Sequence, residues 1–195
     1  MVNGPRSLLL GGVEVVDVRH MFPSSGPAVR LREKALLQGV AIHHDGVIMA
    51  PGDQDYSGTT LNEDLGRLGA VHRHGVSQGW GGMPYHLMAS PNGRCFLTLH
   101  PSHYGAHVAG RNDELLGVSL MGNFMYAQPG DLQLCAAARA LVAIWGWSGR
   151  LLTFKAHREW ALLGSPTSCA GDTWWQWQNR LLVLTVAVAR LLFPQ

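Results

Sequence analysis

Apolar positions recur at helical spacing in three segments of the chain. Leucines three or four residues apart predict a helix over about residues 61–74, and T-L-N-E from Thr60 is typical of a capping box at its start. A second helix is predicted over about residues 131–147, with the aspartate at its start as cap and Gly149 ending it. A third helix is expected to begin at positions 172–173.

Shorter runs rich in β-branched and aliphatic residues predict strands. They are Val13 to Val18, Gly39 to His43, Tyr85 to Ala89, Cys95 to Leu99, Leu116 to Leu120 and Leu151 to Ala156. The P-N-G sequence at positions 91–93 separates two of these runs and predicts a hairpin. Strands and helices in this order predict an α/β fold, a single domain whose central mixed β-sheet is flanked by helices.

The length of 195 residues suits one compact domain with a sizeable core. Residues 1–35 contain one predicted strand, followed by the Pro/Ser/Gly stretch M-F-P-S-S-G-P. We therefore predict that residues 1–35 are an N-terminal lead-in packed on the domain. Residues 36–195 are predicted to form its body and to carry its chemistry.

Composition and charge exclude several classes of protein. Apolar residues make up 47% of the chain and charged residues 14%, which predicts an ordered protein. The net charge of +2 is small and the arginines are scattered, so we expect no nucleic-acid partner. The longest apolar stretch, residues 181–189, is interrupted by Arg190 and falls short of the ~20 residues that span a bilayer. We expect a monomer without membrane insertion.

Cysteine usage is typical of a reducing compartment. Three cysteines do not make a disulfide framework. Cys95 and Cys135 lie in apolar runs and are expected to be buried core thiols, which leaves Cys169 for other chemistry. The early apolar run S-L-L-L-G-G-V is too short and too soon followed by acidic residues to be a secretory signal. We therefore expect synthesis in the cytoplasm.

Candidate metal ligands stand at His43, His157 and Cys169. Two imidazoles and one thiolate without a fourth protein ligand are the ligand set of a catalytic zinc site, where a water takes the open position. His43 and His44 are neighbours on a predicted strand and point to opposite faces, so only one of them can reach a given site. By spacing alone the three residues stay open to a second interpretation, because most histidines are hydrogen-bonded or surface residues.

Five motifs follow one another between about Val13 and Trp177. They are V-A-I-H-H-D-G, G-W-G-G-M-P-Y-H-L, A-H-V-A-G-R-N-D-E-L-L-G-V-S-L-M-G-N-F, A-H-R-E and T-S-C-A-G. Together they resemble the type 2 N-acetylmuramoyl-L-alanine amidases, a family that includes phage lysins and the peptidoglycan recognition proteins. The resemblance implies the fold of that family. It also implies hydrolysis of the amide bond between the lactyl group of N-acetylmuramic acid and L-alanine in peptidoglycan.

The resemblance further implies roles for single residues. His43, His157 and Cys169 would hold one zinc ion, with water as fourth ligand, and zinc would lower the pKa of that water toward ~7. Tyr85 would orient the water. Thr167 would hydrogen-bond the oxyanion as it forms.

Two further family positions, His107 and Asn112, are candidates for substrate binding, and they either contact the substrate or support the site. Trp80, in G-W-G-G, is expected to be a packing residue. Trp174 and Trp177 share a helix face, which predicts burial rather than stacking on sugar rings.

The sequence departs from the family pattern before Tyr85, and it differs from one branch of the family at two further positions. The usual G-Y-H is P-Y-H here, so the backbone before Tyr85 is stiffer. Ser119 stands where the cytoplasmic recycling amidases carry a glutamate, and Cys169 stands where they carry an aspartate. Both differences argue against that branch of the family.

Several biological roles are compatible with these motifs. The leading hypothesis is a phage or prophage endolysin, made in the host cytoplasm and acting on the cell wall after release. A bacterial autolysin or a cytoplasmic recycling amidase of the same fold is the alternative enzyme. A non-catalytic peptidoglycan-binding module is the alternative from another class, known in the family where the cysteine is lost, whereas Cys169 is present here.

Overall fold

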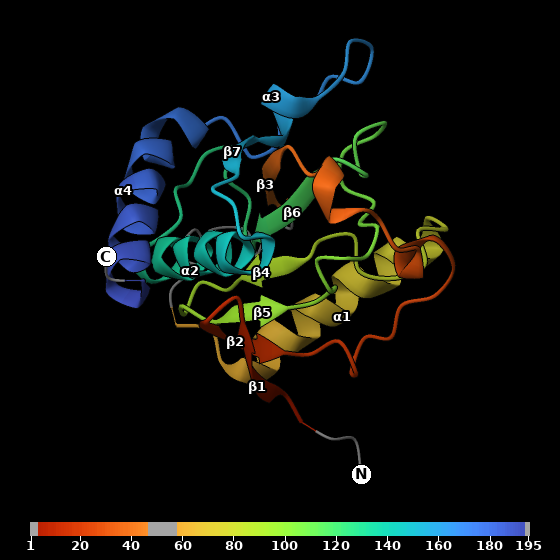
Figure 1. Ribbon diagram of the computed structural model, residues 1–195, viewed down its shortest axis with the longest axis horizontal. Coiled ribbons are helices and arrows are strands. Elements are labelled where there is room, and N and C mark those ends of the chain that lie inside the picture. Colours follow the sequence, from red (N-terminus) through yellow and green to blue (C-terminus); the bar gives the residue numbers. More distant parts are fainter. Residues whose placement is uncertain (1–3, 47–57, 194–195) are drawn as a thin grey trace.

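The computed structural model describes residues 4–46 and 58–193. In these residues seven strands form one sheet in the order β1-β2-β5-β4-β6-β3-β7 (Figure 1). They are β1 (Arg6–Leu10), β2 (Val13–Asp17), β3 (Gly39–His44), β4 (Leu87–Ala89), β5 (Cys95–Leu97), β6 (Leu115–Leu120) and β7 (Thr153–Ala156). The helices are α1 (Leu61–Ser77), α2 (Asp131–Ser148), α3 (His157–Trp160) and α4 (Trp174–Leu192), with short 3-10 helices at Gly26–Val29 and Lys34–Leu36.

The sheet is mixed, as predicted. β4, β6, β3 and β7 run parallel, whereas β1 pairs with β2 and β4 with β5 in antiparallel fashion. The predicted hairpin is confirmed, because β4 and β5 pair directly and the Gly93 N–H donates to the Ser90 carbonyl in their connection. β3 has a parallel partner on each side, so its residues are buried up to His43 at its carboxyl end.

Helices cover both faces of the sheet. Leu87 of β4 joins a core with α2 and α4, whereas the next residue, Met88, joins a second core with Leu68 of α1. Successive strand residues point to opposite faces, so α2 and α4 lie on one side and α1 on the other. α2 lies between the sheet and α4, and its run of buried alanines allows this close approach.

The helix ends follow from local chemistry. Thr60 and Glu63 form the predicted capping box, in which each side chain accepts from the backbone N–H of the other residue. Gly149 ends α2 in the left-handed conformation, with φ of 72°. The prediction that Asp131 caps α2 is wrong by one residue. Gly130 is the N-cap, and Asp131 lies in the first turn, where its charge is favourable to the helix dipole.

The first 35 residues supply β1 and β2 at one edge of the sheet, where the sequence predicted one strand. β1 pairs with β2 along all 5 of its residues. Val13 and Val15 of β2 are buried in the core that the sheet forms with α2 and α4. The predicted boundary at residue 35 therefore follows two strands that belong to the same sheet as the rest of the domain.

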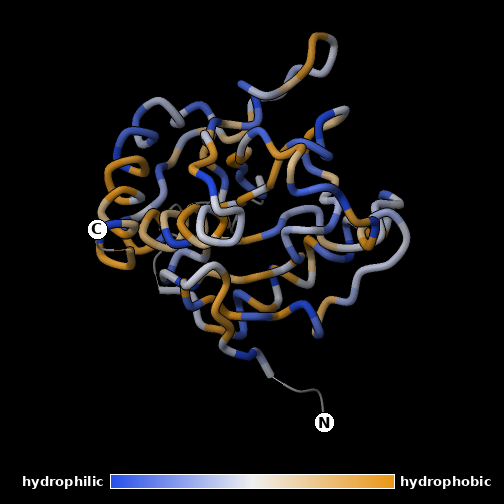
Figure 2. Tube along the Cα trace, viewed as in Figure 1, coloured by the Kyte–Doolittle hydropathy of each residue, from blue (hydrophilic) through white to orange (hydrophobic). Residues whose placement is uncertain are grey.

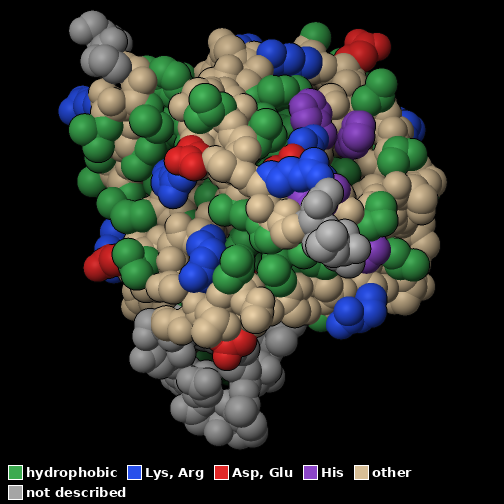
Figure 3. Space-filling view, turned by 90° about the horizontal axis from the view of Figure 1, so that it is seen from below, with side chains coloured by type: hydrophobic (Ala, Val, Ile, Leu, Met, Phe, Trp, Pro, Cys, Tyr) green, Lys and Arg blue, Asp and Glu red, His purple; other side chains and the backbone are tan. Residues whose placement is uncertain are grey.

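α4 buries one face and exposes another. Trp174 and Trp177 are buried, as predicted, whereas Val183 and Leu191 are exposed. The C-terminal half of α4 is strongly hydrophobic (Figure 2), and hydrophobic side chains gather on the side of the molecule where α4 lies (Figure 3). Among the described residues, no helix combines the length and apolar character that crossing a membrane requires.

Candidate metal centre and adjoining groove

The structure brings His43, His157 and Cys169 together. Their ligand atoms all lie within 4.8 Å of one another. His43 lies at the carboxyl end of β3, His157 begins α3 directly after β7, and Cys169 lies in the loop between α3 and α4. β3 and β7 are neighbouring parallel strands, so their carboxyl ends meet at one edge of the sheet, and the two histidine rings lie 4.7 Å apart between centroids.

Hydrogen bonds determine which nitrogen of His43 faces the other two ligands. His43 Nε2 lies 3.1 Å from His107 Nδ1, and His107 Nε2 lies 3.2 Å from the Leu115 carbonyl oxygen. A carbonyl only accepts, so a neutral His107 carries its proton on Nε2 and accepts from His43 Nε2–H through Nδ1. The lone pair of His43 Nδ1 is then free, and this atom lies 3.5 Å from Cys169 Sγ.

His44 points away from the cluster, as predicted for the next residue of a strand. Its Nδ1 accepts a hydrogen bond of 3.0 Å from the backbone N–H of Phe124. Only His43 of the pair belongs to the candidate centre.

The donor set and its spacing fit zinc. Zinc binds cysteine sulfur at ~2.3 Å and histidine nitrogen at ~2.0–2.1 Å, which places tetrahedral neighbours roughly 3.3–3.6 Å apart. The 3.5 Å between Cys169 Sγ and His43 Nδ1 already has this length. The widest separation in the cluster, 4.8 Å, has to contract by roughly 1.2–1.5 Å to match.

Burial keeps all three side chains neutral in the absence of a cation. It lowers the pKa of His43 well below the ordinary value, and His107 and His157 add to the effect. It lowers the pKa of His157 to about 4 and raises the pKa of the Cys169 thiol to about 12. A divalent cation stabilises a thiolate and two neutral imidazoles, so this donor set suits a metal ion.

Tyr85 lies beside the cluster, just before β4, with its ring centroid 4.9 Å from that of His43. Burial raises the pKa of its phenol, and the nearby Cys169 and Asp45 raise it further. The phenol therefore stays protonated near neutral pH and can donate a hydrogen bond. Ser119, in register with His43 on β6, approaches the phenol and opposes this rise. The contact between the Ser119 hydroxyl and the Tyr85 phenol does not meet hydrogen-bond geometry. The buried Ser119 hydroxyl therefore has no hydrogen-bond partner among the described residues.

A groove of about 620 Å³ opens beside the cluster, and His157 and Thr167 line it. Thr167 Oγ1 accepts from the Cys169 N–H at 3.2 Å, which leaves the Thr167 O–H free to donate toward the groove. The other lining residues are Pro27, Gly79, Trp80, Tyr104, Ala106, His107, Val108, Ala109, Gly110, Asn112, Ala161, Ser165 and Pro166.

His107 and Asn112 border this groove but are tied into the protein. Asn112 Oδ1 accepts from the N–H groups of His107 and Val108 at 2.9 and 2.7 Å. Asn112 Nδ2 donates to the Tyr104 hydroxyl at 3.0 Å. Both ring nitrogens of His107 are engaged as well. These contacts anchor both residues within the protein, and substrate binding by either of them stays a prediction.

No family model and no curated protein sequence matches the chain. Solved structures do match. PGRP-SA from Apis mellifera aligns with a TM-score of 0.67 at 17% identity, over 85% of this chain and 95% of that one. The endolysin N-acetylmuramoyl-L-alanine amidase LysCS from Clostridium intestinale URNW aligns with 0.61 at 16% identity, over 86% and 95%. The ectodomain complex of peptidoglycan recognition proteins LCa and LCx, with tracheal cytotoxin bound, aligns with 0.61 at 22% identity, over 77% and 84%.

The chain has the fold of the peptidoglycan recognition proteins and type 2 amidases. The resemblance inferred from the motifs is thus confirmed at the level of the fold, hereafter the PGRP/amidase fold. The matching structures include both an amidase and recognition proteins, so the fold alone does not distinguish hydrolysis from binding.

Three residues at or near the candidate site were not predicted from the sequence to have a role there. Trp80 was expected only to pack, but it lines the groove. Tyr104 lines it too, with the Arg30 guanidinium 4.2 Å above its ring. Asp45, directly after β3, forms an ion pair with Arg67 of α1 and so ties the end of β3 to that helix. An aromatic residue in a glycine-rich loop was the one sequence signal for Trp80.

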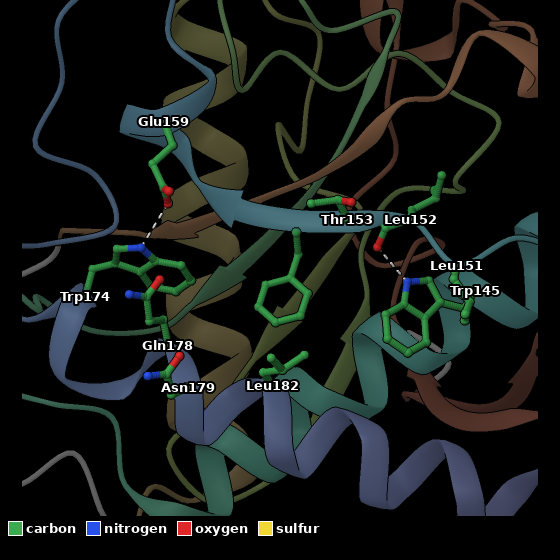
Figure 4. A pocket seen from close by; sticks show the side chains of 10 residues that line it. Trp145, Leu151, Leu152, Thr153, Glu159, Trp174, Gln178, Asn179 and Leu182 are labelled. Carbon is green, nitrogen blue, oxygen red and sulfur yellow. Dashed lines mark hydrogen bonds between the residues drawn. The ribbon is translucent and has the colours of Figure 1, made fainter.

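A second cavity of this protein, with a volume of about 370 Å³, lies between β7 and α4 (Figure 4). None of the three candidate ligands lines it. Trp145 Nε1 donates to the Leu152 carbonyl at 2.8 Å, and Trp174 Nε1 donates to the Glu159 carboxylate at 2.9 Å. The indole donors of this cavity are therefore already paired within the protein.

Proposed function

We propose that this protein is a zinc-dependent N-acetylmuramoyl-L-alanine amidase that acts on peptidoglycan. One observation carries the proposal: His43, His157 and Cys169 converge within 4.8 Å beside a groove, in a fold shared with the amidase LysCS. Three protein ligands with an open fourth position are typical of catalytic zinc, whereas structural zinc has four protein ligands.

Zinc, when bound, supplies Lewis acidity toward the scissile carbonyl and makes water a nucleophile near neutral pH. The neutral imidazoles of His43 and His157 and the Cys169 thiolate would hold the ion. Tyr85 keeps its phenolic proton because its pKa is raised, so it orients the attacking water through hydrogen bonding. The Thr167 hydroxyl donates a hydrogen bond to the carbonyl oxygen, and this contact strengthens as negative charge develops there.

The products follow from adding water across the amide. The lactyl group of N-acetylmuramic acid gains a carboxylate, and the stem peptide gains a free amine on L-alanine. The groove of about 620 Å³ lies within the size range of ligand sites, roughly 300–1,000 Å³, and accommodates the part of the muropeptide around the scissile bond. Trp80 and Tyr104 contribute aromatic surface to its walls.

The test is to incubate zinc-loaded protein with intact sacculi and to identify the soluble products by mass spectrometry. We expect free stem peptides that begin with L-alanine, without new reducing sugar ends, and only without chelator. Cys169→Ala protein, treated identically, is expected to release none. If the zinc-loaded wild type releases no peptide, the proposed activity is wrong.

We further propose that this activity serves a phage or prophage endolysin, a monomer made in the host cytoplasm that reaches the wall after release. The likeness to the endolysin LysCS supports this role. Substrate size separates it from a recycling amidase. An endolysin is expected to cut intact sacculi faster than free anhydromuropeptides, and the reverse preference would favour recycling.

A recognition module is the second candidate, because the same fold occurs in recognition proteins solved with tracheal cytotoxin bound. The complete set of His43, His157 and Cys169 favours the enzyme. Tight binding to sacculi without peptide release by the zinc-loaded protein would favour recognition instead.

A further inference from the structure

A line of buried polar groups runs beneath His43 and ends at an arginine. It passes from His43 Nε2 through the His107 ring to the Leu115 carbonyl, over hydrogen bonds of 3.1 and 3.2 Å. Arg32 Nη1 donates to the same carbonyl. His43, His107 and Arg32 are only 1%, 7% and 9% exposed, so water competes little for these hydrogen bonds.

Arg32 is held by carbonyl groups instead of a carboxylate. In the described part of the chain it forms no ion pair. Its guanidinium donates to the carbonyls of Pro101, Asn112 and Leu115, and its Nη2 lies 2.9 Å from His86 Nε2. Burial lowers its pKa to about 10, so it remains a cation near neutral pH. Burying a cation without a counter-charge is unfavourable. The planar fork of an arginine can hold several carbonyls at fixed angles, which a lysine cannot do.

Arg32 fixes the loop that carries His107. It joins the Asn112 carbonyl, at 2.7 Å from Nη1, to the Leu115 carbonyl at the start of β6. Asn112 in turn accepts from the His107 backbone N–H. Gly117 packs directly against the His107 ring, because a Cβ atom at this position would lie 2.9 Å from the ring. The ring is thus held on several sides, and one tautomer satisfies both of its nitrogens.

We propose that His107 and Arg32 are positioning residues of the metal centre: through the Leu115 carbonyl they fix His43 as its Nε2–H tautomer, so that Nδ1 faces the metal. This inference rests on the metal site of the proposed function and does not depend on hydrolysis. Without His107, the Nε2 proton of His43 has no acceptor and its ring is free to turn. Partners that orient metal-bound histidines in this way typically contribute ~10–100-fold to metal affinity.

The first test reads the tautomers directly, in metal-free protein with ¹⁵N-labelled histidine. Two-bond ¹H–¹⁵N NMR spectra distinguish a proton on Nε2 from one on Nδ1, and histidine-to-glutamine variants assign the signals. We expect His43 and His107 both to carry the proton on Nε2. A wild-type protein with the proton of His43 on Nδ1 would overturn the proposal, whether or not the protein cuts sacculi.

The second test compares His107→Phe, Arg32→Met and Arg180→Met. Phenylalanine keeps a ring at position 107 but cannot accept a hydrogen bond from His43. Methionine keeps roughly the length of the Arg32 side chain but has no hydrogen-bond donor. Both changes are expected to give mixed His43 tautomers and to weaken zinc binding ~10–100-fold in competition with a chelator. Arg180 of α4 is the matched control, because it pairs with Asp131 on the surface and does not line the groove. Its replacement is expected to leave both readouts unchanged.

The outcomes are separable from a loss of folding. If Arg32→Met does not fold, Arg32→Lys keeps the charge but not the fork, and it is expected to show the same mixed tautomers. Wild-type tautomers and zinc affinity in Arg32→Lys would remove Arg32 from the proposal. If folded His107→Phe protein keeps wild-type zinc affinity and His43 is still protonated on Nε2, the proposal is wrong.

Discussion

At the scale of the residue, the Cys169 thiol is the one candidate ligand that has to lose a proton to bind a metal ion. Burial raises its pKa to about 12, so it becomes a thiolate near neutral pH only beside a strong Lewis acid. We predict that Cys169→Ser protein loses zinc on dialysis, because an alcohol is a far weaker ligand than a thiolate. Cys135→Ser is the control and keeps wild-type zinc, as Cys135 lies on α2. Metal analysis after dialysis measures both, and equal zinc in the two variants would contradict the assignment.

Tyr85 is predicted to act on the reaction without holding the metal. Removing its hydroxyl in Tyr85→Phe is expected to slow peptide release from sacculi by ~10²-fold, the usual size of a lost transition-state hydrogen bond. Zinc content is expected to stay unchanged. Tyr126→Phe, at a position 85% exposed, is the matched control and keeps the wild-type rate. A wild-type rate in Tyr85→Phe would exclude this role.

The sequence allowed the candidate ligands and Tyr85 to be proposed, because each stands in a motif that resembles a known family. It named His107 as a residue that either contacts the substrate or supports the site, but it did not predict the hydrogen bond from His43 to His107 or the part played by Arg32. His107 lies 64 positions from His43, and Arg32 lies 83 positions from Leu115. Hydrogen bonds over such separations leave no local pattern, and a charged residue near a proline-rich stretch reads as a surface group.

At the scale of the element, β6 gives the His107 ring its space. Gly117 of β6 faces this ring, and an added Cβ atom would lie 2.9 Å from it, closer than packed atoms approach. We predict that Gly117→Ala displaces His107 from His43 and weakens zinc binding, measured by chelator competition. Gly66→Ala in α1 is the control, since its Cβ atom meets nothing within 4 Å and alanine favours a helix. Unchanged zinc affinity in Gly117→Ala would contradict this packing argument.

Long elements with strong periodicity were predictable, and short or edge elements were not. α1 and α2 were predicted almost to their ends, because leucine spacing, a capping box and a glycine stop agree. β1 was missed, because it lies at the sheet edge and exposes Leu9, which removes the alternation of a half-buried strand. α3 has 4 residues, too few to show a helical period.

At the scale of the whole molecule, three buried histidines make stability depend on pH. Burial lowers the pKa of His43, His86 and His107 well below the ordinary value. Above the unfolded pKa of ~6.5 both states are neutral, so these groups contribute no pH dependence. Below it the unfolded chain takes up protons that the native state does not, and the free energy of unfolding falls by up to ~1.4 kcal/mol per pH unit for each histidine.

Urea unfolding of chelator-treated protein from about pH 8 to about pH 5 measures this effect. We expect a plateau above the unfolded pKa and a steady decline below it. His74→Gln removes an exposed histidine and is expected to leave the decline unchanged. Constant stability down to about pH 5 would contradict the burial of neutral imidazoles.

The α/β class and the mixed sheet could be predicted from the order of strands and helices. The strand order could not, because β2 pairs with β5 and β3 lies between β6 and β7. Such neighbours are set by packing among segments distant in sequence, and local patterns do not encode it. The resemblance to a family was therefore needed to expect this architecture.

The candidate metal centre closes a sequence separation of 126 residues between His43 and Cys169. Closing a loop of this length costs conformational entropy that the contacts formed within it have to offset. During synthesis His43 leaves the ribosome long before Cys169 exists, so a growing chain holds one ligand and lacks the other two. Zinc uptake would thus mark the completion of folding, and a chain stopped before residue 157 would carry one of the three ligands and bind the ion poorly.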